Sequence, residues 1–196
     1  MDAKRIVILS GPSGVGKSTV VSRLISQCDI PIALSISATT REPRRGEVDG
    51  KDYLFLSDDE FQKRREAGEF LECKEVFGRG YWYGTLKETV TTGLLDGKWV
   101  LLEIDVEGAL SVKQEFPDVL MVFLHPGSME ILESRLRNRK TDSEEAILRR
   151  LSVASKELEQ SSQYNHVVEN QTIEHSVEEI CRILRSHDRS QVQENV

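Results

Sequence analysis

Long apolar runs are absent from this sequence of 196 residues. The longest, residues 119–124, has six residues, whereas a helix needs about 20 to cross a bilayer. The first ten residues also lack the extended apolar stretch and the small-residue cleavage site of a secretory signal. We therefore expect a cytoplasmic protein without a membrane partner.

Cysteine is scarce as well. Cys28, Cys73 and Cys181 are odd in number, far apart and without CxxC spacing, which argues against a disulfide framework. The four histidines show no metal-ligand spacing with one another or with a cysteine. No zinc site is therefore expected.

Basic residues are fewer than acidic ones, 26 against 33, which gives a net charge of −7. Such a surface on average repels nucleic acid and anionic lipid. We expect no nucleic-acid partner, and any anionic substrate must be captured by a local group of basic residues.

Strand-like apolar runs alternate with helical patterns along most of the chain. Residues 5–10 form a β-branched run that ends in a glycine-rich turn, and residues 18–28 then carry apolar side chains at helical spacing. The runs at 99–104 and 119–124 are apolar enough for central strands that are buried on both faces. This alternation predicts an α/β fold with a parallel sheet and flanking helices.

Weaker patterns predict the remaining elements. A second strand is expected at residues 33–38 and a final strand at 164–169. Ser176 is followed three residues later by Glu179, a capping-box pattern that predicts the start of the last helix. After Arg189 the polar sequence predicts a frayed end.

The alternation is interrupted in the middle of the chain by Arg, Pro and Gly residues. Short strands are expected there at 52–56 and 70–76, with a capped helix at 57–67 between them. We therefore expect one domain, consisting of a core at about 1–38 and 98–188, a small inserted subdomain at about 39–97 and a lid at about 138–145.

Residues 11–18 read GPSGVGKS, which matches the phosphate-binding pattern G-x-x-x-x-G-K-[ST] between a strand and a helix. The glycines let successive N–H groups turn inward around a phosphate. Lys17 can then reach the β- and γ-phosphate oxygens, and the Ser18 hydroxyl can bind Mg²⁺. The residues of this predicted nucleotide site are Gly11, Ser13, Gly14, Val15, Gly16, Lys17, Ser18 and Thr19.

A phosphate-binding loop alone does not distinguish a GTPase from an ATPase or a kinase. Residues 105–108, DVEG, fit the D-x-x-G pattern of GTPases. A GTPase also needs an N-K-x-D loop, and the nearest candidate, at 138–142, has the wrong spacing and follows a predicted helix. The GTPase is the less favoured alternative.

Several separate segments resemble those of guanylate kinases, from residue 5 to 184. They are GPSGVGKS from 11, SISATTREPRRGEVDGKDY at 35–53, GEFLE ending at Glu72, YGT at 83–85, LEIDVEGA from 102 and SRLRNRKTDSEEAILRRL from 134. The resemblance implies a P-loop NTPase-type sheet with an inserted α+β subdomain for a nucleoside monophosphate. It also implies transfer of the γ-phosphoryl group of ATP, with Mg²⁺, to GMP. We expect dGMP as a further acceptor and either a monomer or a homodimer, which the sequence does not decide.

The resemblance implies roles for basic residues. Arg41 and Arg44 match the arginines that clamp the acceptor phosphate, a dianion that suits bidentate donors, and Tyr53 and Tyr83 match its hydroxyl donors. The residues that would act on the transferred phosphoryl group are Lys17, Arg41, Arg135, Arg139 and Arg150.

Recognition of guanine is assigned in the same way. Guanine presents two adjacent donors, N1–H and N2–H₂, so a carboxylate that accepts twice can read it. Glu72 matches that position, Asp105 matches a second carboxylate, and Ser37 and Thr85 match hydroxyls near the base. Glu47 matches a position near the acceptor, although pairing with an arginine is an equal alternative.

Two other functions stay open. One is an inactive guanylate-kinase-like module that binds a phosphorylated protein through Arg41, Arg44 and Tyr53, which the intact phosphate-binding loop disfavours. The other is a kinase for a different small phosphorylated acceptor, which Glu72 disfavours. The chain also departs from common family members, with Glu103 in place of Asp and Glu107 in place of Gln.

Overall fold

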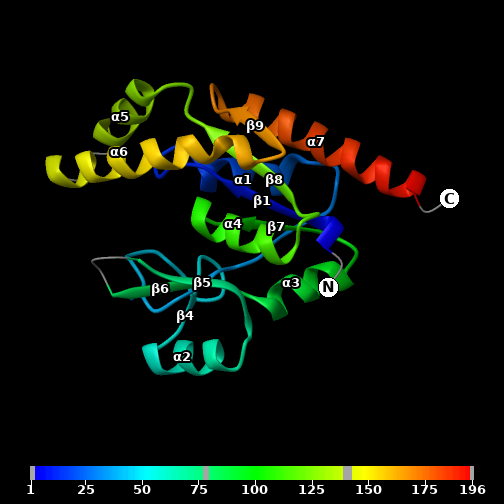
Figure 1. Cartoon of the computed structure of the whole chain (residues 1–196), viewed down its shortest axis with the longest axis horizontal. Coiled ribbons are helices and arrows are strands. Elements are labelled where there is room, and N and C mark those ends of the chain that lie inside the picture. The colour runs from blue at the N-terminus through cyan, green and yellow to red at the C-terminus, as the bar shows by residue number, and fades with distance from the viewer. Residues whose placement is uncertain (1–2, 77–79, 139–142, 195–196) are drawn as a thin grey trace.

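A sheet of five parallel strands forms the centre of the molecule (Figure 1). The computed structural model describes residues 3–76, 80–138 and 143–194. The spatial order of the strands is β2-β7-β1-β8-β9. Their bounds are Ile6–Ser10 for β1, Ile32–Leu34 for β2, Trp99–Glu103 for β7, Leu120–His125 for β8 and His166–Glu169 for β9.

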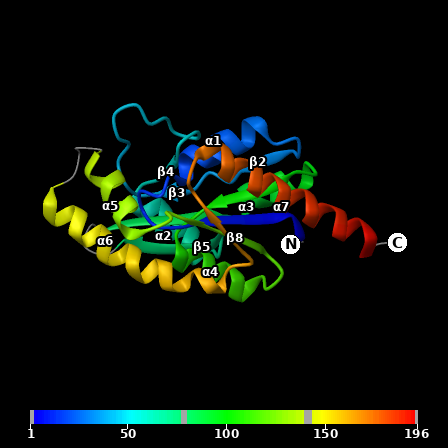
Figure 2. The ribbon, with the colours of Figure 1, turned by 90° about the horizontal axis from the view of Figure 1, so that it is seen from above.

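Helices cover both faces of this sheet, as Figure 2 shows for α1 and α7 on one side and α4 on the other. Successive side chains of a strand point to opposite faces. Val7 and Leu9 accordingly pack in the cluster with α1 and α7, whereas Ile6 and Ile8 pack with α3 and α4. The predicted α/β fold with a parallel sheet is confirmed. The helices are α1 (Lys17–Gln27), α3 (Lys87–Leu95), α4 (Val106–Glu115) and α7 (Ile173–Glu194).

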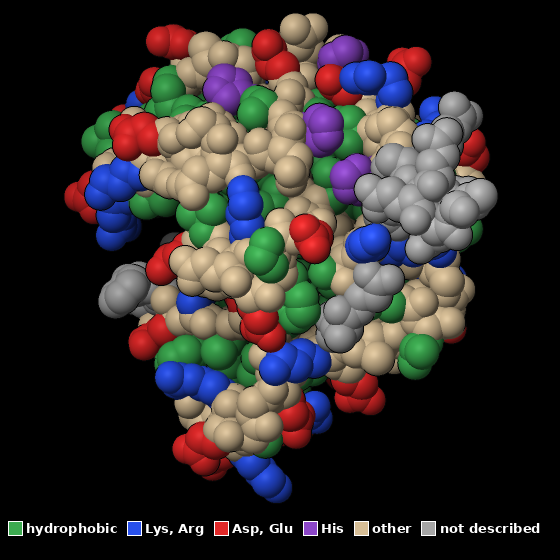
Figure 3. Space-filling model, turned by 45° about the vertical axis from the view of Figure 1, so that its right-hand side comes forward, with side chains coloured by type: hydrophobic (Ala, Val, Ile, Leu, Met, Phe, Trp, Pro, Cys, Tyr) green, Lys and Arg blue, Asp and Glu red, His purple; other side chains and the backbone are tan. Residues whose placement is uncertain are grey.

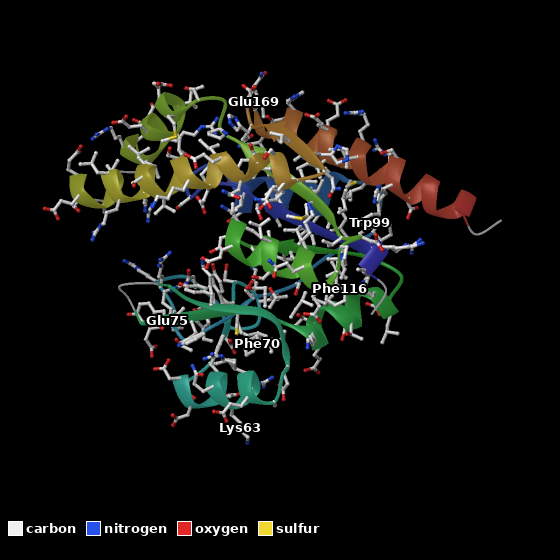
Figure 4. The ribbon with its side chains drawn as sticks, viewed as in Figure 1. Lys63, Phe70, Glu75, Trp99, Phe116 and Glu169 are labelled. Carbon is white, nitrogen blue, oxygen red and sulfur yellow. The ribbon has the colours of Figure 1, made fainter. Side chains whose placement is uncertain are left out.

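A second, smaller sheet has the order β4-β3-β6-β5 and contains antiparallel pairs. Its strands are β3 (Ala38–Thr39), β4 (Leu54–Phe55), β5 (Phe70–Val76) and β6 (Tyr81–Leu86). The α2 helix (Asp58–Glu66) packs against it, and the rings of Phe61 and Phe70 stack at 4.4 Å. Figure 4 shows Phe70 on the α2 side of the sheet and Trp99 in the large sheet.

Two further helices follow β8, namely α5 (Met129–Asn138) and α6 (Glu144–Glu159). They pack together through Leu132, Leu136, Ile147 and Ala154. Residues 139–142, the middle of the expected lid, lie outside the described residues. One-turn 3₁₀ helices occupy Ala3–Arg5 and Gln160–Gln163. Within the described ranges, no helix is long and apolar enough to span a membrane.

Three predicted boundaries are wrong. The expected strand at 33–38 is divided between β2 and β3, which belong to different sheets. The last helix begins at Ile173 and not at Ser176, because the Thr172 hydroxyl accepts from the His175 N–H and the buried Ser176 hydroxyl bonds to Asn170. The same helix continues to Glu194, beyond the expected fraying point.

Candidate active site

The phosphate-binding loop connects β1 to α1 and is shaped by its glycines. Gly11 and Gly16 have φ angles of +146° and +108°, which L side chains rarely adopt. A Cβ at Gly11 would also lie 2.3 Å from the Leu124 carbonyl oxygen. Gly16 is the N-cap of α1, so the first N–H groups of the helix are available to an anion at this end.

The two reactive side chains of the loop have different neighbours. Lys17 Nζ donates to the carbonyl oxygens of Gly11 at 2.5 Å and Pro12 at 3.3 Å. Ser18 Oγ donates to Glu103 Oε1, at the end of β7, at 2.6 Å. Glu103 was noted in the sequence only as a substitution, and its place at the carboxyl end of a central strand is the signal that could have identified it.

A polar network from α5 and the β9–α7 junction hydrogen-bonds to the backbone of the loop. The carbonyl oxygen of Val15 accepts from Asn170 Nδ2 at 2.7 Å and from Arg135 Nη1 at 3.1 Å. Arg135 also donates to the Asn170 carbonyl oxygen at 2.7 Å, and Asn170 accepts from the buried Ser176 hydroxyl. Arg135 therefore contacts the backbone of the loop and of Asn170. Asn170 had no motif signal, because its role depends on contacts 155 residues apart in the sequence.

A cavity of about 770 Å³ lies between the loop and the small sheet. The space-filling view in Figure 3 shows an indentation at the left edge of the molecule, and acidic and basic side chains are interspersed over this face. Nine of the predicted site residues line the cavity: Lys17, Ser18, Ser37, Arg44, Glu47, Tyr53, Glu72, Tyr83 and Asp105.

Arg41 is 7% exposed and does not line the cavity. Its guanidinium forms a bidentate pair with Glu47 at 2.9 and 3.0 Å and donates to Tyr83 Oη at 3.1 Å. It also lies 5.3 Å from the ring centre of Tyr53. The hydrogen bonds from Arg41 lower the pKa of Glu47, so Glu47 is ionised and adopts the arginine pairing that the sequence left open.

Glu72 is the most perturbed carboxyl group in the cavity. Burial raises its pKa from the ordinary 4.5 to about 7, against the opposing hydrogen bond from Thr85 Oγ1 to Glu72 Oε1 at 2.7 Å. The value of about 7 also includes the negative charge of Asp105, which raises the pKa, and the positive charge of Lys74, which lowers it. Glu72 is therefore partly protonated near neutral pH.

The remaining predicted residues are not among those that line the cavity. Thr85 is buried behind Glu72, Ser13 and Thr19 are exposed on the loop and the first turn of α1, and Arg150 is half-buried on α6. Arg139 lies outside the described residues. Glu157 on α6 was not predicted: burial raises the pKa of its carboxyl group, and the charge of Lys17 opposes this.

Comparisons with known proteins agree with this arrangement. A family model described as guanylate kinase matches residues 3–187. The guanylate kinase of Rhodopirellula baltica is 55% identical over 182 residues, which cover 92% of this chain and 87% of that protein. The guanylate kinase of Caldanaerobacter subterraneus is 45% identical and covers 93% of this chain and 91% of its own.

A solved structure gives the same result. The crystal structure of guanylate kinase from Anaplasma phagocytophilum superimposes with a TM-score of 0.73 at 34% identity, over 92% of this chain and 84% of that one. These matches extend over both sheets and the loop between β1 and α1. The chain therefore belongs to the guanylate kinase family.

Proposed function

We propose that this protein transfers the γ-phosphoryl group of ATP to GMP, giving ADP and GDP. One observation carries the proposal: a single cavity is lined by Lys17 and Ser18 of the phosphate-binding loop and by the half-buried Glu72. Residues suited to bind a nucleoside triphosphate and a residue suited to recognise a purine base thus line the same cavity. The family relationship supports the same reaction.

The reaction needs no covalent enzyme intermediate, because the phosphate of GMP is itself the nucleophile. Catalysis then depends on positioning two polyanions in line and neutralising the charge between them. We assign Lys17 to the donor phosphates, and Arg44, Tyr53 and Tyr83 to the acceptor phosphate. All four line the cavity. Arg41 supports this group through its bonds to Glu47 and Tyr83. We assign the remaining cationic roles to Arg135, Arg139 and Arg150.

Selection of guanine follows from the hydrogen-bond pattern of Glu72. The ionised carboxylate accepts from N1–H and N2–H₂ of guanine, with Thr85 fixing its other side. Adenine would place the N1 lone pair against the carboxylate, and unpaired buried polar groups are costly. We therefore propose that GMP and dGMP are accepted and AMP is rejected, with Ser37 and Asp105 completing the base site.

The loop fits a magnesium ion that accompanies ATP. Ser18 Oγ and Glu103 Oε1 are 2.6 Å apart at the carboxyl edge of the sheet, and hydroxyl and carboxylate oxygens are ligands that Mg²⁺ prefers. In the part of the chain that the structure describes, no three His, Cys, Asp or Glu residues gather as a metal cluster, so we propose that the ion is held by these two groups and the nucleotide phosphates. Bound there, it would offset negative charge on the transferred phosphoryl group.

We also propose that the protein acts on free nucleotides in the cytoplasm, as a monomer or a homodimer, without nucleic acid or membrane. The net charge of −7 supports the absence of nucleic-acid and membrane partners, because nucleic acids and anionic lipids are not attracted to the average surface.

A coupled assay of ADP release tests the function. With Mg²⁺ and ATP, GMP and dGMP should support turnover, whereas AMP, CMP and UMP should be at least about 10³-fold poorer in kcat/KM. Lys17→Ala is the matched control for contaminating kinases and should be inactive. Equal rates with AMP would reject the assignment of Glu72, and no turnover with any monophosphate would reject the function.

A further inference from the structure

Lys74 on β5 connects the two sheets at the wall of the cavity. Its Nζ lies 2.5 Å from Asp105 Oδ2 and 3.0 Å from Glu107 Oε2. Asp105 is the N-cap of α4, and Glu107 lies in the first turn of that helix. Lys74 thus joins the strand that carries Glu72 to the helix that starts at the edge of the large sheet.

The contact between β5 and the start of α4 is close. A Cβ on Gly108 would lie 3.0 Å from Glu72 Oε2, so no larger residue fits there without movement of the carboxyl group. Asp105 uses both of its oxygens in this contact, because Oδ1 accepts from the Gly108 N–H at 2.9 Å while Oδ2 pairs with Lys74. The orientation of the Asp105 carboxylate is therefore fixed from two sides.

The carboxylates between β5 and the start of α4 are stabilised by the positive charge of Lys74. Asp105 acts electrostatically on Glu72 and shares Lys74 with Glu107, and like charges at such distances repel. Burial alone would lower the pKa of Lys74, but its hydrogen bonds and charge interactions with Asp105 and Glu107 raise it, so Lys74 is positively charged. The charged groups that act on Glu72 are Asp105 and Lys74, with opposite effects.

We propose that Lys74 is a positioning residue for guanine recognition. It holds the Asp105 carboxylate at the cavity wall and fixes the position of β5, and with it Glu72, relative to the start of α4. This inference rests on the proposed function, since it assigns the base end of the same site. Lys74 lines the cavity together with Glu72 and Asp105, yet the phosphate-binding loop is on other elements. Its effect should therefore fall on GMP and not on ATP.

The test measures steady-state kinetics of Lys74→Ala and Lys74→Arg against wild type. Lys74→Ala should raise KM for GMP about five- to tenfold with kcat and KM for ATP changed less than about twofold, a size typical of a small charge network. Lys74→Arg should restore most of the loss. Lys98→Ala is the matched control, because Lys98 forms a comparable ion pair with Asp96 at 3.0 Å outside the cavity lining.

A pH profile separates positioning from mere support of the fold. Without Lys74, Glu72 loses the positive charge that lowers its pKa, so its pKa should be higher in Lys74→Ala than in wild type. Since the protonated carboxyl group accepts guanine poorly, KM for GMP should increase on acidification, and this increase should begin at a higher pH in the variant. Lys74→Gln keeps most of the side chain and removes its charge. It should raise KM for GMP in the same direction, which keeps the test decisive if Lys74→Ala does not fold.

The outcomes distinguish the two proposals. Wild type that makes no GDP would reject the proposed function itself. The role of Lys74 alone would be rejected by any of three results obtained with active wild type. These are an unchanged KM for GMP in Lys74→Ala and Lys74→Gln, an equal rise of KM for GMP and KM for ATP, or a pH profile that does not move.

Discussion

Glu72 is the residue on which the choice of base depends. Glu72→Gln keeps one acceptor but presents an amide donor to a donor of guanine, so we expect kcat/KM for GMP to fall about 10²- to 10³-fold. The coupled assay with GMP and AMP checks this. A variant that keeps more than about one third of the wild-type value would contradict the role of Glu72, and the neighbouring exposed Glu75→Gln is the control.

The raised pKa of Glu72 also predicts a pH dependence of stability. Its pKa is about 7 in the folded protein and near 4.5 when unfolded, so the folded state holds its proton more tightly. The free energy of unfolding should therefore decrease, by up to about 3 kcal/mol, as the pH rises from 4.5 to 7. Urea unfolding at pH 5 and pH 8 without nucleotide measures this.

Glu72→Gln is the control for that measurement. The free energy of unfolding of the variant should not show this decrease. The difference in stability between the variant and wild type should therefore shift in favour of the variant from pH 5 to pH 8. The same pH dependence in both proteins would show that the carboxyl group is not perturbed as described.

Arg150 offers a different residue-scale test. A cation that offsets charge formed during phosphoryl transfer can contribute about 10³- to 10⁵-fold in rate. Arg150→Ala should therefore lower kcat by at least about 10³-fold while KM for GMP changes less than about threefold. Equal effects on kcat and on GMP affinity, measured in the same assay, would assign Arg150 to binding.

At the scale of elements, Asn170 links the β9–α7 junction to the phosphate-binding loop. Asn170→Ala removes the bond to the Val15 carbonyl oxygen and leaves Ser176 without its acceptor. Loss of buried hydrogen bonds of this kind costs about 1–3 kcal/mol. We expect this loss in urea unfolding together with an increase of about tenfold in KM for ATP, whereas the exposed Gln171→Ala should behave as wild type. An unchanged KM for ATP would separate Asn170 from the loop.

The elements also show where sequence patterns succeed. The strand at 70–76 and the helix capped by Ser57 were predictable, because their signals are local. The start of α7 was not, since Ser176 has the sequence of a cap but is buried against Asn170. Residues 33–38 read as one strand because a local apolar run does not show that the chain passes from one sheet to another.

At the scale of the whole molecule, the parallel sheet was predictable from alternating elements. Nine of the residues that line the cavity were predictable from the phosphate-binding motif and a long family resemblance. What the sequence did not show are contacts between distant segments: Glu103 with Ser18, Asn170 with Val15, and Lys74 with Asp105. Each depends on how β5, β7 and β9 are brought to one place by the fold. Arg41 was assigned to the phosphate by resemblance, and its pairing with Glu47 required the three-dimensional arrangement.

The central claim is that the cavity holds both nucleotides and passes a phosphoryl group between them without water. Chromatographic measurement of ADP and GDP from one reaction tests it most directly. With ATP, Mg²⁺ and GMP, we predict ADP and GDP in equal amounts. Without GMP we predict very little ADP, because the acceptor phosphate supplies the nucleophile. ADP formed without an equal amount of GDP would contradict it.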